Sequence, residues 1–237
     1  MIKYSIIIPV YNEEDNISIL YQRIKKVMDK LNKPYEIIWV NDGSIDNSLN
    51  ILKKLKEKDK VNRVISFKRN HGQTAAMDAG FRNAKGEIFI TLDADLQNDP
   101  EDIPKMLKLL DEYDMVAGWR YKRQDNFIRR LSSKIANWIR NKLTYDNIAD
   151  TGCSLKVYKR ECLENIKLFE GLHRFLPTLI KNEGFKVTQM KVKHHPRKYG
   201  KSKYGVMNRA FKALKDLFAV RWMIQRSLRY KKDMEEL

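Results

Sequence analysis

The stretch "GEIFITLDADLQNDPED", residues 86–102, joins an apolar run to acidic and amide side chains and then to a helix start. The run is continuously apolar rather than alternating, as expected for a strand buried on both faces of a parallel sheet. Asp99 followed by Pro100 is a helix-start signal, with the aspartate as cap and the proline at the first helical position. The stretch therefore predicts a buried strand, a polar turn and a helix.

Similar apolar runs recur through the first half of the chain, and segments with helical spacing lie between them. The runs are residues 4–11, 35–42, 62–68 and 113–119. In residues 15–31, apolar side chains recur at Ile17, Leu20, Ile24, Val27 and Leu31, on one helical face. This alternation predicts an open, mostly parallel α/β sheet with helices on both faces. Ligands bind such sheets at the carboxyl ends of the strands.

The pattern changes after residue 120. We expect an amphipathic helix, an irregular segment, a second helix, a strand and a terminal helix, at residues 125–143, 150–161, 173–184, 185–194 and about 206–230. No internal repeat or low-complexity linker divides the chain. We therefore expect one domain, residues 1–205, followed by a basic amphipathic helical element, residues 206–237.

The charge is concentrated in two segments. The chain has a net charge of +17, of which residues 120–142 carry +7 and residues 191–232 carry +13, so the rest carries −3. Basic patches beside a near-neutral body indicate polyanionic partners: nucleic acid, nucleotide phosphates or an anionic membrane surface.

The compartment is predicted from features that the sequence lacks. Two cysteines, Cys153 and Cys162, make no disulfide framework and no zinc spacing, which fits a reducing compartment. The first residues have no cationic segment and cleavage site of a signal peptide, and no run of about 18 apolar residues is present. We therefore expect a cytoplasmic protein with no membrane span.

The turn after residue 92 carries the clearest chemical signal. Asp93 and Asp95 can both reach a hard cation from one turn, with the amide oxygen of Gln97 as a third ligand. Mg²⁺ or Mn²⁺ prefers such oxygen donors and usually shares its shell with substrate phosphates. The alternative is that these acids only cap the following helix.

Six motifs together resemble a known family. They are "SIIIPVYNEE", "NDGSIDNS", "NHGQTAAMDAG", "DADLQNDPED", "GWRY" and "RKYGKSKYG", in this order across roughly residues 3–205. The chain resembles the family 2 glycosyltransferases of GT-A fold, specifically polyprenyl-phosphate sugar synthases such as dolichol-phosphate mannose synthase. This resemblance implies a metal-dependent inverting transfer of a hexose or hexosamine from a GDP- or UDP-sugar to a polyprenyl phosphate, with a non-lipid acceptor as the alternative. The reaction would take place on the cytosolic face of the membrane.

The resemblance also implies roles for single residues. A nucleotide-sugar pocket would include Pro9, Tyr11, Glu13, Asp42, Asp93, Ala94 and Arg120. Asp95 and Gln97 resemble the metal ligands, and Arg129 with Ser133 resembles a pair that faces the acceptor phosphate. Asp150 aligns with a family aspartate, although Gly152, Cys153 and Ser154 depart from the usual pattern after it. A phosphate acceptor is already ionised at neutral pH, so among the catalytic candidates Asp95, Arg120 and Asp150 we expect Asp150 to orient or to be structural, with a direct general-base role as the alternative.

The loop at residues 194–205 allows two interpretations. Gly200, Lys201 and Ser202 match the tail of a phosphate-binding P-loop, but His195 stands where that motif requires glycine. The resemblance instead implies a mobile loop whose Arg197 and Lys203 grip the donor diphosphate and close over the site.

The terminal helix presents an apolar stripe among basic residues. Met207, Phe211, Leu214, Phe218 and Trp222 form the stripe. A basic amphipathic helix is typical of binding to an anionic membrane surface. A twin subunit or a small membrane-protein partner would fit the same helix, and these alternatives stay open. A nucleic-acid partner is not expected, because the chain shows none of the standard binding signatures.

Overall fold

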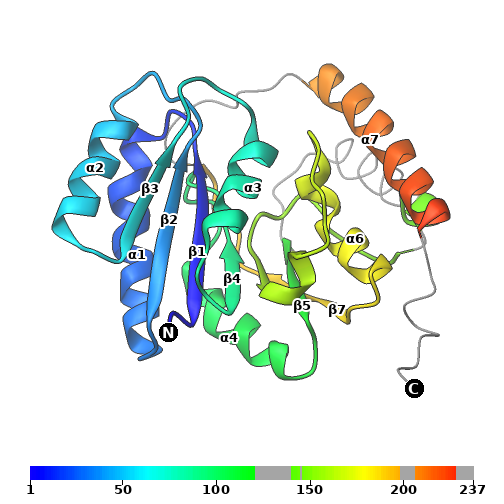
Figure 1. Cartoon of the computed structure of the whole chain (residues 1–237), viewed down its shortest axis with the longest axis horizontal. Helices are drawn as coiled ribbons and strands as arrows, with labels where there is room; N and C mark the ends of the chain where they lie inside the picture. The colour runs from blue at the N-terminus through cyan, green and yellow to red at the C-terminus, as the bar shows by residue number, and fades with distance from the viewer. Residues whose placement is uncertain (121–139, 145, 198–205, 228–237) are drawn as a thin grey trace.

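The computed structural model describes residues 1–120, 140–144, 146–197 and 206–227, and gives the backbone alone for residues 206–213 (Figure 1). Arg129, Ser133 and Lys203, together with Gly200, Lys201 and Ser202, lie outside the described residues. Of the helix expected at residues 125–143, the described part is the helical segment at residues 140–144. No helix in the described ranges is both long and apolar enough to cross a bilayer.

A seven-stranded sheet forms the centre of the protein, in the order β3-β2-β1-β4-β6-β5-β7. The strands are β1 (Tyr4–Val10), β2 (Tyr35–Asn41), β3 (Asn62–Ser66), β4 (Ile88–Thr91), β5 (Met115–Arg120), β6 (Lys156–Lys159) and β7 (Val187–Val192). Strands β1 to β4 pair in parallel, as do β5 and β7, whereas β6 runs antiparallel to both β4 and β5. The predicted mostly parallel α/β sheet is therefore confirmed.

Strand β6 was not predicted from the sequence. Residues 150–161 were expected to be irregular, but Lys156–Lys159 fills the space between β4 and β5. The strand has four residues and a lysine at each end, so neither its length nor its apolar content distinguishes it from a loop. Its position in the sheet depends on pairing with β4, which is distant in the sequence.

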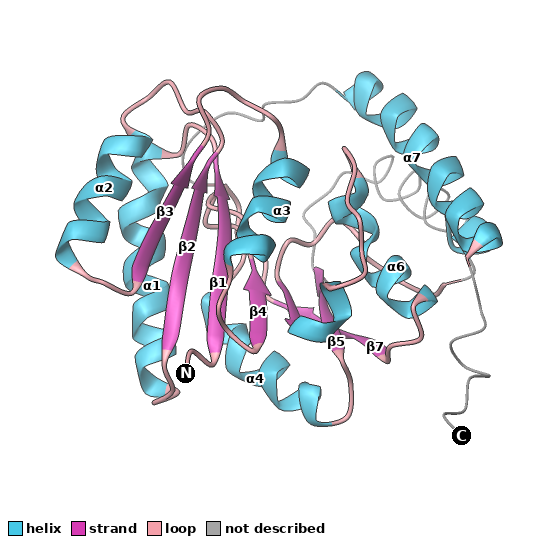
Figure 2. Cartoon of the chain, viewed as in Figure 1, coloured by secondary structure: helices cyan, strands magenta, loops and turns pink. Residues whose placement is uncertain are grey.

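Helices cover both faces of the sheet (Figure 2). They are α1 (Glu14–Lys30), α2 (Ser48–Lys58), α3 (Gln73–Asn83), α4 (Ile103–Lys108), α6 (Leu176–Asn182) and α7 (Val206–Arg226), with 3-10 turns η1 (Pro100–Asp102), η2 (Leu109–Asp111), η3 (Arg160–Leu163) and η4 (Leu172–Phe175). Helices α1, α2 and α4 share one core cluster with the sheet, and α3 and α6 share the other. This is the predicted arrangement.

Helix α7 packs on the body through a third cluster. Leu217, Val220 and Ile224 contact the cluster formed by Leu172, Phe175 and Leu179 of η4 and α6. The stripe predicted from the sequence lies elsewhere on the helix: Leu214, Phe218 and Trp222 are 47%, 57% and 64% exposed. Helix α7 therefore has one apolar face that packs and a second one that is open to solvent.

Candidate active site

The predicted site residues of the central strands gather at one edge of the sheet. Pro9 is the next-to-last residue of β1, the acidic turn follows β4, and Arg120 ends β5. Parallel strands place their carboxyl ends at the same edge, which is where open α/β sheets bind ligands. Pro9 fits there because the pairing of β1 with β4 stops at Ile7, so no ladder bond to β4 needs its missing N–H.

The acidic turn is held by contacts from three other segments. Gln73 of α3 donates from Nε2 to Asp93 Oδ1 at 2.6 Å, and the Asp93 N–H donates to Ser154 Oγ at 3.0 Å. Arg197 donates to Asp95 Oδ2 at 2.7 Å. Leu96 has a φ of 62°, a left-handed conformation that a non-glycine residue adopts at a cost of about 1–2 kcal/mol. The backbone therefore reverses sharply between Asp95 and Gln97.

The electrostatics of this turn favour a bound cation. Burial and the nearby carboxylate of Asp95 raise the pKa of Asp93 to about 6, because two acids share a site shielded from water. The amide nitrogen of Gln97 is directed to the carbonyl of His195 at 3.4 Å, so the amide oxygen is the atom that could bind a cation. Carboxylate and amide oxygens suit Mg²⁺ or Mn²⁺.

The donor set is small. The described residues contain no group of three or more His, Cys, Asp or Glu side chains arranged to hold a metal. A magnesium-type ion is commonly held by one or two carboxylates and completed by substrate phosphates, so Asp95 and Gln97 fit that use.

Arg120 and Asp150 form a bidentate ion pair. Arg120 Nε lies 2.7 Å from Asp150 Oδ2, and its Nη2 lies 2.8 Å from Oδ1. The N–H of Gly152 also donates to Asp150 Oδ1, at 3.1 Å. The side chains are only 16% and 8% exposed. Asp150 thus holds the arginine side chain at the end of β5, next to the acidic turn.

The start of the predicted clamp loop is fixed to the acidic turn. The N–H of His195 donates to the carbonyl of Gln97 at 2.8 Å, and His195 Nε2 lies 3.1 Å from Asp99 Oδ2. With the Arg197 to Asp95 ion pair, these contacts place the first of the two predicted clamp cations in the site.

Three residues of the predicted nucleotide pocket, Tyr11, Glu13 and Asp42, lie in the loops after β1 and β2. The carboxylate of Asp42 accepts hydrogen bonds from the N–H groups of His71 and Gly72 at 2.7 and 2.9 Å. Glu13 accepts one from Asn16 Nδ2 at 2.7 Å. Tyr11 is half-buried in the loop that also carries Glu13. The structure thus gives Asp42 and Glu13 local partners in the loops that would surround a nucleotide.

Sequence reasoning missed several polar residues that line the same edge. Gln73, Ser154, Lys156 and His173 all interact with the acidic turn or with each other. Ser154 and Lys156 fall in the segment expected to be irregular, and His173 lies in a predicted helix with no motif around it. Only Gln73 carried a signal, as part of "NHGQTAA" at a strand end.

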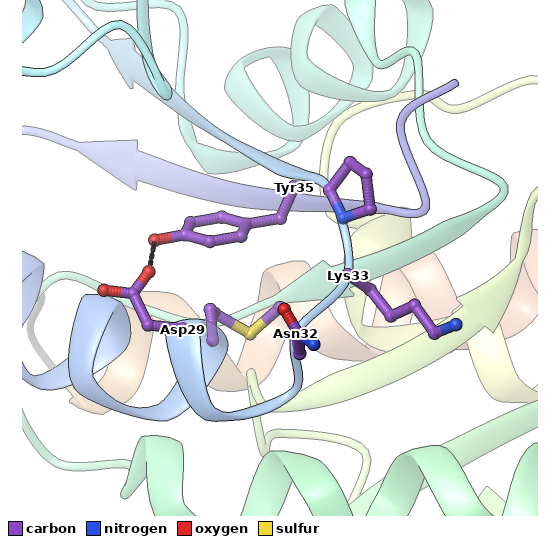
Figure 3. Close-up of a pocket in the computed structure, with 6 residues that line it drawn as sticks. Asp29, Asn32, Lys33 and Tyr35 are labelled. Carbon is purple, nitrogen blue, oxygen red and sulfur yellow. Dashed lines mark hydrogen bonds between the residues drawn. The ribbon is translucent and has the colours of Figure 1, made fainter.

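A shallow pocket lies at the other end of the sheet. It is lined by residues around the start of β2, where Tyr35 donates to Asp29 Oδ1 at 2.6 Å (Figure 3). The amino ends of parallel strands are not where such sheets bind substrates. We therefore assign the candidate active site to the carboxyl edge.

Comparison with known proteins agrees with this geometry. Residues 5–167 match the family described as glycosyl transferase family 2. The chain belongs to glycosyl transferase family 2. It is 37% identical over 230 residues to a dodecaprenyl-phosphate galacturonate synthase of Rhizobium johnstonii, covering 94% of this chain and 68% of that protein. It is 39% identical to an undecaprenyl-phosphate 4-deoxy-4-formamido-L-arabinose transferase of Edwardsiella ictaluri, covering 86% of this chain and 63% of the relative.

Solved structures show the same fold at low identity. A glucosyl-3-phosphoglycerate synthase from Mycobacterium tuberculosis, in complex with Mn²⁺, uridine diphosphate and phosphoglyceric acid, has a TM-score of 0.69 at 16% identity. The match covers 96% of this family 2 chain and 80% of that one. The mannosyltransferase PcManGT from Pyrobaculum calidifontis, in complex with GDP-Man and Mn²⁺, has a TM-score of 0.64 at 18% identity, over 96% and 65% of the chains. The fold is therefore that of the GT-A glycosyltransferases.

Proposed function

We propose that this family 2 glycosyltransferase moves a sugar from a GDP- or UDP-linked donor to a polyprenyl phosphate, with Mg²⁺ or Mn²⁺ as cofactor. The observation that carries the proposal is its similarity, over 94% of the chain, to a relative named as a dodecaprenyl-phosphate galacturonate synthase. The edge at which Asp93 and Asp95 meet Arg120 and Arg197 supports it, because a diphosphate leaving group needs cations around it.

Each predicted residue has a role in this reaction. Asp95 and Gln97 would hold the divalent cation, which supplies charge compensation for the departing nucleotide diphosphate. Arg120 and Arg197 add positive charge beside it, and Lys203 extends the clamp. The remaining contacts to the donor come from Pro9, Tyr11, Glu13, Asp42, Asp93 and Ala94. The acceptor phosphate would be bound by Arg129 and Ser133.

Asp150 acts in this proposal as an orienting residue. Its carboxylate accepts hydrogen bonds from the Arg120 side chain and from the Gly152 N–H. A carboxylate engaged in a bidentate ion pair is a weak base, and an ionised phosphate needs no base to attack. Asp150 therefore serves the reaction by holding Arg120.

We also propose that α7 docks on the cytosolic surface of an anionic membrane, where the lipid acceptor is found. Phe218 and Trp222 are exposed one helical turn apart, and Lys215 is exposed beside them. Exposed aromatics among cations suit the boundary between lipid headgroups and acyl chains. Leu217 and Val220 fix the helix to the body, so the exposed face would orient the active site relative to the membrane.

The transfer reaction is tested with the purified chain, Mg²⁺ or Mn²⁺, a panel of nucleotide sugars and a polyprenyl phosphate. We expect one donor to yield a sugar lipid and Asp95→Ala to reduce the rate by at least a hundredfold. Absence of product with every donor, or full turnover by Asp95→Ala, would refute the proposal.

Membrane docking is tested by sedimentation with vesicles that contain anionic phospholipid. Phe218→Ser combined with Trp222→Ser should weaken binding, whereas Ile19→Ser, on an exposed site of α1, should not. Unchanged sedimentation of the double variant would count against the membrane. A concentration-dependent dimer lost in the same variant would assign this face to a second copy of the chain.

A further inference from the structure

Lys156 is a buried lysine in the middle of the sheet. It is 2% exposed and lies opposite Thr91 on β4 and Ala117 on β5. Directly paired residues of antiparallel strands point to the same face, and Tyr158, two residues along, packs in the core cluster that contains α3 and α6. The side chain of Lys156 therefore extends toward the α3 side, at the edge where β4 leads into the acidic turn.

Among the described residues, this ammonium group has no direct partner. Within the described part of the chain, Lys156 Nζ makes no hydrogen bond and no ion pair, whereas Arg120 and Arg197 at the same edge each pair with a carboxylate. Burial lowers the pKa of Lys156, and Asp93 and Asp150 oppose that effect at longer range. An unpaired buried cation costs several kcal/mol, so a fold that keeps one commonly uses it at a functional site.

The groups around Lys156 form a polar wall. Thr74, in the first turn of α3, accepts the Gly171 N–H at 3.0 Å and shares a hydrogen bond of 2.7 Å with His173 Nδ1. Burial and the nearby Lys156 charge lower the pKa of His173 to about 3, so its ring is neutral. Its Nε2 has no partner among the described residues. Lys156 and His173 thus each keep a polar atom for a ligand.

We propose that Lys156 is a specificity-determining residue whose ammonium group donates a hydrogen bond to an oxygen of the transferred sugar. This inference rests on the proposed function. The two described arginines of the edge, Arg120 and Arg197, are each paired with a carboxylate and are the cations proposed for the diphosphate, which leaves Lys156 for the sugar.

The chemistry of the neighbours fits a sugar. A sugar hydroxyl donates and accepts at the same time, so Lys156 as a donor and the Asp93 carboxylate as an acceptor at the same edge can satisfy both of its needs. A sugar carboxylate would satisfy the ammonium group equally well. In both cases Lys156 contacts the sugar and not the nucleotide.

Binding of the sugar can be separated from binding of the nucleotide. The probes are UDP-glucose, UDP-galacturonate and GDP-mannose, each compared with UDP or GDP, in the presence of Mn²⁺ by isothermal titration calorimetry. Lys156→Met keeps an unbranched side chain that is one heavy atom shorter and removes the charge. Lys159→Met is the matched control. Lys159 lies at the other end of the same strand, where its Nζ forms an ion pair of 2.8 Å with Asp114 Oδ1. Lys156→Gln serves as a second variant, and Tm verifies folding.

The wild type should bind at least one sugar nucleotide. Lys156→Met should then lose tenfold or more in affinity for it, keep its affinity for the matching diphosphate within twofold, and melt no lower than the wild type. A larger loss for UDP-galacturonate than for UDP-glucose would assign the contact to a carboxylate, and an equal loss would assign it to a hydroxyl.

Other results overturn the inference. Equal losses for sugar nucleotide and diphosphate, or no loss in either Lys156 variant, would show that Lys156 does not read the sugar. A wild type that binds no nucleotide and no sugar nucleotide would instead refute the proposed function.

Discussion

The ion pair between Arg120 and Asp150 allows a quantitative test of how the site is held. Asp150→Asn leaves the Arg120 guanidinium in place, with its side chain 16% exposed, and removes the charge that balances it. Removing one partner of a buried pair costs about 3–5 kcal/mol, because the remaining charge is uncompensated. In a chain of this size the melting temperature should fall by on the order of 10 °C.

The effects of the two substitutions on stability should also be coupled. Adding Arg120→Met to Asp150→Asn removes the orphaned charge, so the double variant should recover about 2–3 kcal/mol relative to the sum of the single variants. Sugar transfer should not recover, because the double variant lacks the cation that we propose for the diphosphate. Stability is measured by urea unfolding and transfer by product formation.

A control pair defines the background. Arg82 and Asp78 form an exposed ion pair of 2.7 Å on α3, so Asp78→Asn should change stability little. Additive effects of Arg120→Met and Asp150→Asn would refute the argument that Asp150 acts through Arg120. A fall in Tm for Asp78→Asn as large as that for Asp150→Asn would show that burial does not decide the effect.

Three further predictions concern other parts of the fold. Gly43 has a φ of +67°, and a Cβ there would lie 2.3 Å from the backbone of Arg69, so Gly43→Ala should lower Tm and weaken nucleotide binding in calorimetry. Burial depresses the pKa of His173 to about 3, so its stabilising effect is complete above about pH 6.5 and is lost as the pH falls toward 3. His173→Gln should therefore show a shallower loss of Tm below pH 6 than the wild type. Leu217→Ala, on the buried face of α7, should destabilise by about 2–4 kcal/mol in urea unfolding, whereas Phe218→Ser on the exposed face should not.

Most of the sheet was predictable because its strands are apolar along their whole length. Five of the seven strands come from continuous runs such as residues 4–10, a pattern that is typical of strands buried on both faces. Strand β6 was not predictable, because "KVYK" is short and begins with the lysine that becomes buried. Its strand character comes from pairing with β4 and β5 and not from its own composition.

The candidate site also has parts that the sequence predicts and parts that it does not. The acidic turn after β4 was predictable, since chain order places its carboxylates at a strand end. The bidentate contact between Arg120 and Asp150 was not, because 30 residues separate the two in sequence. The approach of His173 to Thr74 spans 99 residues and depends on how η4 packs against α3. Contacts between residues so far apart in the sequence cannot be predicted from a local sequence pattern.

The place of β6 in the sheet has a consequence for synthesis of the chain on the ribosome. Until residue 159 has emerged, β4 has a free edge with the apolar sequence "IFIT", and β5 has no neighbour that links it to the first four strands. A free apolar edge is a site for pairing with other chains. Strand β6 is the link between β4, which leads into the acidic turn, and β5, which ends at Arg120, so a nascent chain that stops short of β6 has neither a continuous sheet nor a complete candidate site.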